Sequence, residues 1–208
     1  MKATDLRYIK TEELIIDAFM FFAAQYGMED IHIKDICNKA RISRNAFYGH
    51  YENKYQVLDT VFRITRNKML DRYTRDIARN LARNSMKDVS RWCVRAVHDN
   101  ETELRILARC SQKYFRELIR EVFISGTLRS IYDHTEEIRK DTRLRMIEAY
   151  ISDGLTSMIL VWLEHPDEIT EEQFADSLYE ISHDAVEYFY QKLDDSRIVS
   201  RKTSLNEK

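Results

Sequence analysis

The sequence predicts an all-α fold, and three observations lead to this prediction. Only 4 of the 208 residues are glycine and 1 is proline, whereas all-β folds and alternating β/α folds need frequent turn residues. Apolar residues recur at the three- and four-residue spacing of amphipathic helices along most of the chain. Hydrophobic residues make up 44% of the chain and charged residues 33%, a composition that excludes a disordered or fibrous protein.

The first predicted helix covers residues 11–26, where apolar side chains recur on one face. Gly27 follows it directly, at the position where a helix commonly ends in a left-handed residue that glycine adopts without cost. A short connection then leads to a second helix, which carries Ile33, Ile36 and Ala40 on one side.

A three-residue turn over residues 41–43 separates this second helix from a third, short helix over residues 44–51. Ser43 is a suitable N-cap for the third helix because its hydroxyl can accept a hydrogen bond from a free amide. Asn53 is the predicted N-cap of a fourth helix, with Gln56 in the capping-box position three residues later.

The remaining chain also has helical periodicity. The fourth helix is predicted to reach about residue 80, and Ser85 can open a fifth. Two later helices, near 144–164 and 172–190, carry heptad-like apolar seams that are typical of helices packed at a shallow angle. The seam residues are Leu144, Ile147, Ile151, Leu155, Met158 and Trp162 in the first helix and Phe174, Leu178, Ile181, Ala185 and Tyr188 in the second.

Thr170 and Gln173 form a predicted capping box at the start of the later of these two helices. From Asp194 onward the chain is polar, so residues 194–208 are predicted to be a frayed, disordered tail.

The charge pattern is informative only locally. The formal net charge of −2 gives no support for binding to nucleic acid. Between residues 32 and 54, however, five basic side chains stand against two acidic ones. A patch of this size is more often a solvated face than a binding site, so the identity of its residues has to decide.

A helix, a three-residue turn and a short helix have the spacing of a helix-turn-helix, whose second helix can enter the major groove of DNA. An arginine can bind guanine or phosphate bidentately, an asparagine can pair with adenine, and hydroxyl or imidazole groups can donate to phosphates. The candidates of these types are Ser43, Arg44, Asn45, Tyr48 and His50. Phe47 and Tyr51 are four residues apart and are expected to point to the core.

Lys54 lies in the first turn of the predicted fourth helix. There its ammonium group, the free amides and the helix dipole would all favour an incoming phosphate. Lys34, in the second helix, is balanced between a solvated charge and a DNA contact.

Residues 11–62 resemble the N-terminal domain of the tetracycline-repressor (TetR) family of bacterial transcription regulators. The resemblance rests on the apolar first helix ending at Gly27, on residues 33–43, and on residues 46–54 with their aromatic residues and Lys54. It implies that six residues face an operator: Ser43, Arg44, Asn45, Tyr48, His50 and Lys54. It also implies a helix-turn-helix DNA-binding domain over 1–60 and a helical regulatory and dimerisation domain over 61–193.

Two residues depart from the family's pattern. Arg41 stands where the turn usually has glycine, so a residue with a side chain is expected to adopt a positive φ at some strain. His32 stands where a serine or threonine usually caps the second helix and contacts a phosphate. A neutral imidazole can still do either, with a contribution that depends on pH.

The resemblance further implies a homodimer that binds a palindromic operator and is released by a small-molecule effector. The two later helices, near 144–164 and 172–190, are the predicted dimer interface, because pairing them with their symmetry mates gives a four-helix bundle. Aromatic and imidazole side chains in the middle of the chain are candidates to line an effector pocket, although such residues more often fill a helical core. The candidates are Trp92, His98, Tyr114, Tyr132 and Tyr150.

The leading hypothesis is therefore a DNA-binding repressor, and the alternative is a helix-turn-helix regulator that activates transcription or acts through a protein partner without a small-molecule pocket. An enzyme is not predicted, since the chain offers no nucleophile–base pair, glycine-rich phosphate loop or metal motif. No cofactor or metal is predicted.

The cysteines Cys37, Cys93 and Cys110 are widely spaced and predict buried thiols in the reducing cytoplasm. No membrane partner is predicted, because no apolar run approaches the ~18 residues of a membrane span.

Overall fold

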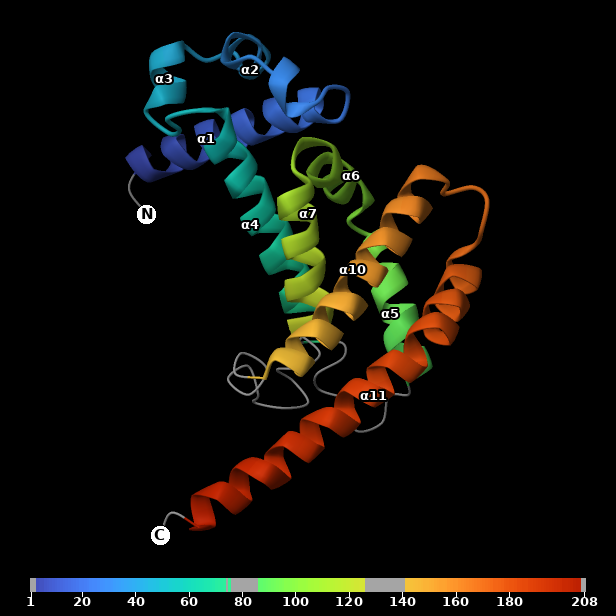
Figure 1. Cartoon of the computed structure of the whole chain (residues 1–208). Helices are drawn as coiled ribbons and strands as arrows, with labels where there is room; N and C mark the ends of the chain where they lie inside the picture. Colours follow the sequence, from blue (N-terminus) through green and yellow to red (C-terminus); the bar gives the residue numbers. More distant parts are fainter. Residues whose placement is uncertain (1–2, 74, 76–85, 126–140, 207–208) are drawn as a thin grey trace. The chain divides into compact units, whose positions relative to one another are not determined.

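The computed structural model describes residues 3–73, 75, 86–125 and 141–206, and helices dominate these segments (Figure 1). The first part holds α1 (Ala3–Ala23), the 3-10 turn η1 (Met28–Asp30), α2 (Ile33–Ala40), α3 (Arg44–Tyr48) and α4 (Lys54–Tyr73). The middle part holds α5 (Met86–His98), α6 (Glu101–Cys110), α7 (Gln112–Ile119) and the π-helical segment η3 (Arg120–Ser125). The last part holds α10 (Thr142–Glu164) and α11 (Glu171–Asn206). The described residues contain no strand, which confirms the predicted all-α fold.

The chain divides into two compact units. Unit 1 comprises Met1–Lys68 and Asn100–Phe115, and unit 2 comprises Met69–Asp99 and Arg116–Lys208. The predicted domain limits at residues 60 and 193 stay predictions.

The core of unit 1 forms where the apolar faces of α1, α2 and α3 meet. Phe19 on α1, Ile36 on α2 and Phe47 on α3 are fully buried. Helix α1 packs against α2, and α2 packs against α3. This packing fixes the short α3, since a helix of five residues is too short to be stable by itself.

The first helix ends differently from the prediction. Helix α1 ends at Ala23, and Gly27 follows three residues later as the residue before η1. Gly27 has φ −71° and ψ 165°, which is extended backbone. The expectation of a left-handed Gly27 is therefore wrong: a backbone turn from Phe22 closes the helix, with the amide of Tyr26 donating to the carbonyl of Phe22 at 2.8 Å.

The predicted cap of the fourth helix is confirmed. The side-chain oxygen of Asn53 accepts hydrogen bonds from the amides of Tyr55 and Gln56 at 2.9 and 3.1 Å. The side chain of Gln56 reaches back one residue further than in a standard capping box and accepts from the amide of Glu52 at 2.8 Å.

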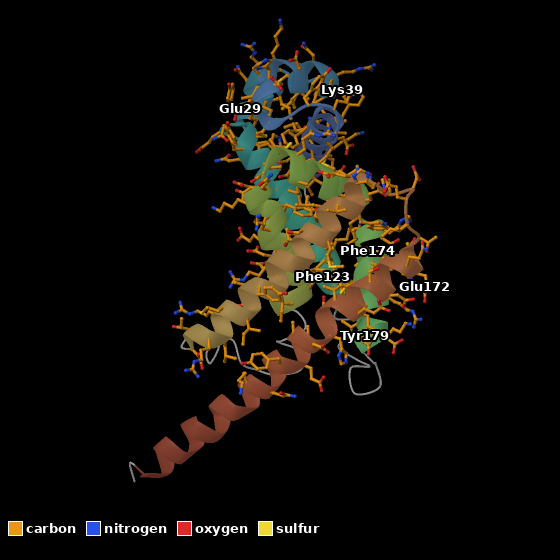
Figure 2. All side chains as sticks on the ribbon, turned by 45° about the vertical axis from the view of Figure 1, so that its right-hand side comes forward. Glu29, Lys39, Phe123, Glu172, Phe174 and Tyr179 are labelled. Atoms are coloured by element: carbon orange, nitrogen blue, oxygen red, sulfur yellow. The ribbon has the colours of Figure 1, made fainter. Side chains whose placement is uncertain are left out.

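Unit 2 is built around α11, which packs against both α5 and α10 (Figure 1). Phe123 in η3 and Phe174 near the start of α11 are core residues of this unit (Figure 2). The indole of Trp92 meets the ring of Phe123 edge-on, with 5.7 Å between ring centroids. The indole of Trp162 stacks on the ring of Phe174, with 4.9 Å between centroids.

The predicted capping box of α11 is confirmed in both directions. The amide of Gln173 donates to the hydroxyl of Thr170 at 3.2 Å, and the amide of Thr170 donates to the side-chain oxygen of Gln173 at 2.8 Å. At its other end, α11 continues to Asn206. The expectation of an irregular tail from residue 194 is corrected over 194–206, because this stretch has no glycine or proline to stop a helix that is already nucleated.

Candidate nucleic-acid interface

The predicted helix-turn-helix is present in unit 1. Helix α2 ends at Ala40, residues 41–43 form the turn, and α3 begins at Arg44. The hydroxyl of Ser43 accepts a hydrogen bond from the amide of Ala46 at 3.1 Å, so Ser43 is the N-cap that the sequence predicts.

The turn requires a left-handed residue, and Arg41 supplies it. Arg41 has φ 56° and ψ 44°, and it is the only residue with positive φ in the described part of the chain. The amide of Arg41 donates to the carbonyl of Asn38 at 3.3 Å, and the amide of Ile42 donates to that of Cys37 at 3.0 Å. These two bonds form a Schellman motif, in which glycine is the usual left-handed residue. The expected positive φ at Arg41 is confirmed.

Helix α3 presents two kinds of side chain on opposite sides. Phe47 is fully buried, and Tyr51 just beyond the helix is 5% exposed, as predicted. Ser43, Arg44 and Asn45 are exposed, and Tyr48 is 55% exposed. The buried aromatic residues hold the helix in place, while its polar side chains are free to meet a ligand.

Tyr51 anchors the end of this region to α1. Its hydroxyl donates a hydrogen bond to the carboxylate of Glu12 at 3.1 Å. Burial, with the nearby charge of Glu12 adding to it, raises the pKa of Tyr51 to about 12. The bond therefore persists at neutral pH.

A surface hollow of about 430 Å³ lies between α2, α3 and the start of α4. It brings together five of the predicted DNA-contact residues, which are His32, Lys34, Arg44, Tyr48 and Lys54. His32 occupies the N-cap position of α2 but makes no side-chain capping bond. The first turn of α2, which is not capped by a side chain, thus opens onto a hollow lined by basic residues, an arrangement that suits a phosphate.

His50 is oriented differently from the exposed candidates. Its ring stacks on that of Tyr8 from α1, with 3.9 Å between centroids. Its Nδ1 atom is buried and has no hydrogen-bond partner among the described residues. Because Nδ1 is buried, a phosphate contact of His50 would have to use Nε2.

Lys54 lies in the first turn of α4 as predicted, but its ammonium group points to the protein backbone. Its Nζ atom donates to the carbonyl oxygens of Met28, Ile31 and Glu29 at 2.7, 3.0 and 3.2 Å. Sequence reasoning missed these contacts, because nothing in the spacing shows that η1 ends beside α4.

A second surface of interest lies on α10 and α11. Large apolar side chains on these helices are exposed to between 50% and 72%: Met146, Tyr150, Val161, Ile181 and Tyr188. We call this set the apolar stripe. Along α10 its members share one face with the exposed Gly154 and Ser157, because spacings of three and four residues return to the same side of a helix.

The apolar stripe corrects the predicted seam. Leu144, Leu155 and Trp162 of α10 and Phe174 and Leu178 of α11 are buried inside unit 2. These five of the eleven seam residues therefore pack within one chain and are not available to a partner. Only Ile181 and Tyr188 belong both to the predicted seam and to the exposed stripe.

The predicted pocket residues that the structure describes are divided between the two units. Tyr114 belongs to unit 1, where its ring stacks on Phe62 at 5.0 Å and its hydroxyl donates to Asp59. In unit 2, Trp92 is buried against Phe123. An effector pocket lined by these residues stays a prediction.

Two further pocket candidates, His98 and Tyr150, lie in unit 2 and are exposed to at least half of their surface. His98 is half-exposed, with Nδ1 3.5 Å from a carboxylate oxygen of Glu171. Tyr150 is 72% exposed as part of the apolar stripe. Tyr132 lies outside the described residues.

A hollow that the sequence analysis did not predict lies where α10 ends and α11 begins. Its volume is about 410 Å³, and Val161, Trp162, His165, Ile169 and Phe174 are among the residues that line it.

Helix α10 also meets the criteria of length and composition for a membrane-spanning helix, with a mean hydropathy of 1.3 over its most apolar window. The expectation that no stretch approaches this length is thereby corrected. The window is 39% buried within the protein, and the buried side of α10 carries Glu148, Ser152 and Thr156. An apolar core helix that also carries an exposed apolar stripe has the same composition, and the absence of a membrane partner stays a prediction.

The three cysteines of the described segments are buried or partly buried. Cys37 and Cys93 are buried as predicted, and burial raises the pKa of both thiols. Cys110 is partly exposed, and burial again raises its pKa. Within the described segments, no group of three histidine, cysteine or acidic residues could hold a metal ion.

Comparison with known proteins gives local similarity in sequence and chain-wide similarity in fold. No family model matches the sequence. A segment of 74 residues is 34% identical to an uncharacterized HTH-type transcriptional regulator of Bacillus subtilis, YxbF, and covers 35% of this chain. A segment of 61 residues is 31% identical to the probable acrEF/envCD operon repressor of Escherichia coli and covers 29% of this chain. These segments span 20% and 28% of the two relatives, respectively.

Solved structures match over most of the chain. A TetR transcriptional regulator from Streptococcus agalactiae has a TM-score of 0.63 at 18% identity, over 86% of this chain and 96% of that one. A TetR-family regulator from Streptomyces coelicolor has a TM-score of 0.59 at 16% identity over the whole of both chains. NalD of Pseudomonas aeruginosa, described as the secondary repressor of a multidrug efflux pump, has a TM-score of 0.54 at 22% identity over 85% of this chain and 95% of that one. The predicted resemblance is confirmed at the level of the fold.

Proposed function

We propose that this chain, which has the fold of the TetR family of transcription regulators, is itself a sequence-specific DNA-binding regulator. The observation that carries the proposal is the orientation of α3. Phe47 is buried beneath the helix, while Arg44, Asn45 and Tyr48 are exposed on it. A recognition helix needs this division, because the same short element must be held by the core and offered to the groove.

The proposed contacts divide into two classes. Arg44 and Asn45, at the start of α3, are placed to read base edges in the major groove. Ser43, Tyr48, His32, Lys34 and His50 would contact the phosphate backbone, which positions the protein without reading sequence.

We further propose that the regulator is a homodimer formed through α10 and α11. A single recognition helix contacts few base pairs, and a two-fold dimer doubles the contact at a fixed half-site spacing. The apolar stripe supports this interface, since apolar side chains such as Tyr150 and Ile181 are exposed on neighbouring helices in one chain. The DNA site would accordingly be a palindrome.

Repression with release by a small molecule is the proposed mode of action, in the cytoplasm where the DNA is. Helix α4 supplies residues to both units, so an effector bound in unit 2 that shifts α4 would act on the helix-turn-helix. The alternative is a regulator that activates transcription or answers to a protein partner. An effector experiment separates these two modes of regulation. If a small molecule that stabilises the protein in a thermal-shift screen is an effector, it should weaken DNA binding by the coupling free energy between the two sites, typically about 1–3 kcal/mol.

The proposal is tested by a mobility-shift assay with a duplex that the protein selects from a random pool. The variants are Arg44→Ala and Tyr48→Ala, singly and together, with Tyr26→Ala as the control, because Tyr26 is another exposed tyrosine of unit 1 outside the helix-turn-helix. We expect the double variant to lose specific binding and the control to keep it. Specific binding by the double variant at the affinity of the unchanged protein would refute the site.

A further inference from the structure

We infer that Lys54 is a positioning residue of the DNA-binding unit and not a phosphate ligand. Its ammonium group joins the first turn of α4 to the end of η1 and thereby sets the place where α2 begins. The inference rests on the proposed DNA-binding function for its consequences, but the contact itself is a property of the protein alone.

The first step is the hydrogen-bonding capacity of the ammonium group. A lysine ammonium has three N–H donors and no acceptor. The three carbonyl oxygens of Met28, Glu29 and Ile31 lie at 2.7, 3.2 and 3.0 Å from Nζ, all within hydrogen-bonding distance. Each donor therefore has a backbone partner, and a phosphate could bind Lys54 only by replacing one of them.

The second step is the position of these carbonyls in the chain. Met28 and Glu29 belong to η1, and Ile31 is the residue that closes it. Their carbonyls lie at the end of a short helical turn, where partial negative charge gathers and a cation is favoured. The bonds to Met28 and Ile31 are partly buried, so water would not replace them without rearrangement.

The third step links this contact to the surface that would meet DNA. Ile31 is followed directly by His32, the N-cap of α2, and then by Ile33 and Lys34 in its first turn. The same hollow is lined by these residues, by Arg44 and Tyr48 of α3, and by Lys54 itself. Lys54 thus holds the entry to α2 at a fixed distance from α4, and it is on α2 and α3 that the proposed DNA contacts stand.

The surroundings of Lys54 differ from those of Lys34, the exposed lysine on the same surface. Lys34 is exposed on α2, where its charge can reach a phosphate without leaving a backbone partner. Replacing Lys34 should remove a charge from the interface. Replacing Lys54 should release the segment that carries the interface.

The experiment compares Lys54→Met, Lys54→Arg and Lys34→Met in the full chain. Methionine keeps an unbranched side chain that ends where the ammonium group of lysine would begin, and it removes the three N–H donors. Arginine keeps the charge, but its planar fork cannot direct three N–H groups at three carbonyls around one point. Lys34→Met is the matched control.

The first measurement needs no DNA. Hydrogen exchange of the peptide over residues 28–36 should become roughly tenfold faster in Lys54→Met and faster in Lys54→Arg, and should stay unchanged in Lys34→Met. Unchanged exchange in both Lys54 variants would overturn the inference. If Lys54→Met does not fold, the arginine variant decides alone.

The second measurement uses the duplex that the unchanged protein selects from a random pool. Both Lys54 variants should bind it roughly tenfold more weakly with an unchanged slope of log K against log salt, whereas Lys34→Met should lower the slope by about 0.9. Full affinity in Lys54→Arg together with a slope lowered by about 0.9 in Lys54→Met would make Lys54 a phosphate ligand and overturn the inference. If the unchanged protein selects no duplex, the proposed function fails, and the exchange measurement still decides the role of Lys54.

Discussion

Two exposed surfaces of this protein differ in kind, and the difference shows what each is suited to bind. On α3 in unit 1 the exposed side chains are polar or amphipathic, with Arg44, Asn45 and Tyr48 above a buried Phe47. On α10 and α11 in unit 2 the exposed side chains include large apolar ones, such as Tyr150 and Ile181. Polar donors on one helix are suited to bind the phosphates and base edges of a DNA duplex. Exposed apolar side chains are suited to pack against another protein.

The comparison also separates residues that hold a surface from residues that form it. Phe47 and Tyr48 are neighbours in sequence, with ring centroids 5.6 Å apart, yet only Phe47 is buried. In unit 2, helix α10 likewise carries a buried residue, Leu155, and an exposed one, Tyr150. Substitutions in each pair should therefore change different measurements.

The largest expected effect comes from Phe47→Ala. Removing a fully buried phenylalanine creates a cavity and should lower the free energy of unfolding by about 3–5 kcal/mol. Tyr48→Ala at the neighbouring position should change this free energy by no more than about 0.5 kcal/mol while weakening specific DNA binding. Urea denaturation of the full chain, monitored by circular dichroism, measures the free energy of unfolding of both variants. Equal destabilisation by the two substitutions would show that α3 is not divided into a buried and a binding side.

The next effect is on self-association. Ile181 is 67% exposed on α11, and a glutamate there would place a charge in the proposed dimer interface. We expect Ile181→Glu to weaken the dimer by roughly 2–4 kcal/mol, measured by sedimentation equilibrium. Ile64→Glu is the control, because Ile64 is 49% exposed on α4 in unit 1. Dissociation by the control to the same extent would assign the interface to another surface.

The comparison explains which parts of the fold could be predicted from the sequence. Caps were predictable because the cap and the amide that it binds lie within a few residues, as Ser43 with Ala46 and Thr170 with Gln173 show. The end of α1 was not, because the hydrogen bond that closes it involves only backbone atoms, which every residue except proline can supply.

The site shows the same division. The burial of Phe47 and the exposure of Tyr48 follow from helical periodicity, and both predictions are confirmed. The partners of Lys54 lie 23 to 26 residues away in sequence, and no local pattern indicates such a contact. In unit 2 the period of the seam was correct, but periodicity alone does not show whether its partner lies in the same chain or in a second copy.

A smaller effect is expected from the ionisation of Tyr51, which joins the end of the helix-turn-helix to α1. Its pKa is raised to about 12 by burial, from about 10 in an unfolded chain. The folded protein therefore holds this proton more tightly than the unfolded chain. Stability from this group is present below pH 10 and is lost as the pH rises toward 12, by at most about 1.4 kcal/mol per pH unit.

The variant Tyr51→Phe isolates this contribution. It lacks the hydroxyl that donates to Glu12, so its free energy of unfolding should be lower at neutral pH and should fall less steeply between pH 10 and 12. Urea titrations of both proteins at each pH measure the difference. Parallel pH profiles for the two proteins would mean that Tyr51 ionises as freely in the folded state as in the unfolded chain.

The smallest expected effects are at Arg41 and Gly27. Arg41 has a conformation that favours glycine, and Gly27 has a conformation that does not require it. Arg41 is left-handed, with φ 56°, while Gly27 is extended, with φ −71°. Arg41→Gly should raise the free energy of unfolding by about 0.5–1 kcal/mol, since glycine adopts the left-handed region without the steric cost.

Gly27→Ala should also stabilise, by about 0.4–1 kcal/mol, because alanine restricts the unfolded chain and a Cβ at this position would meet nothing within 4 Å. Arg41→Ala is the control for the loss of the arginine side chain, and it should not stabilise because alanine keeps the strain of the left-handed backbone. Urea denaturation of the three variants measures these differences. Equal stabilisation by Arg41→Ala and Arg41→Gly would contradict this expectation, because the gain would then come from removing a charge and not from relieving the backbone. A gain confined to glycine would show instead that the turn before the recognition helix is held in a strained conformation by the packing of α2 and α3 around it.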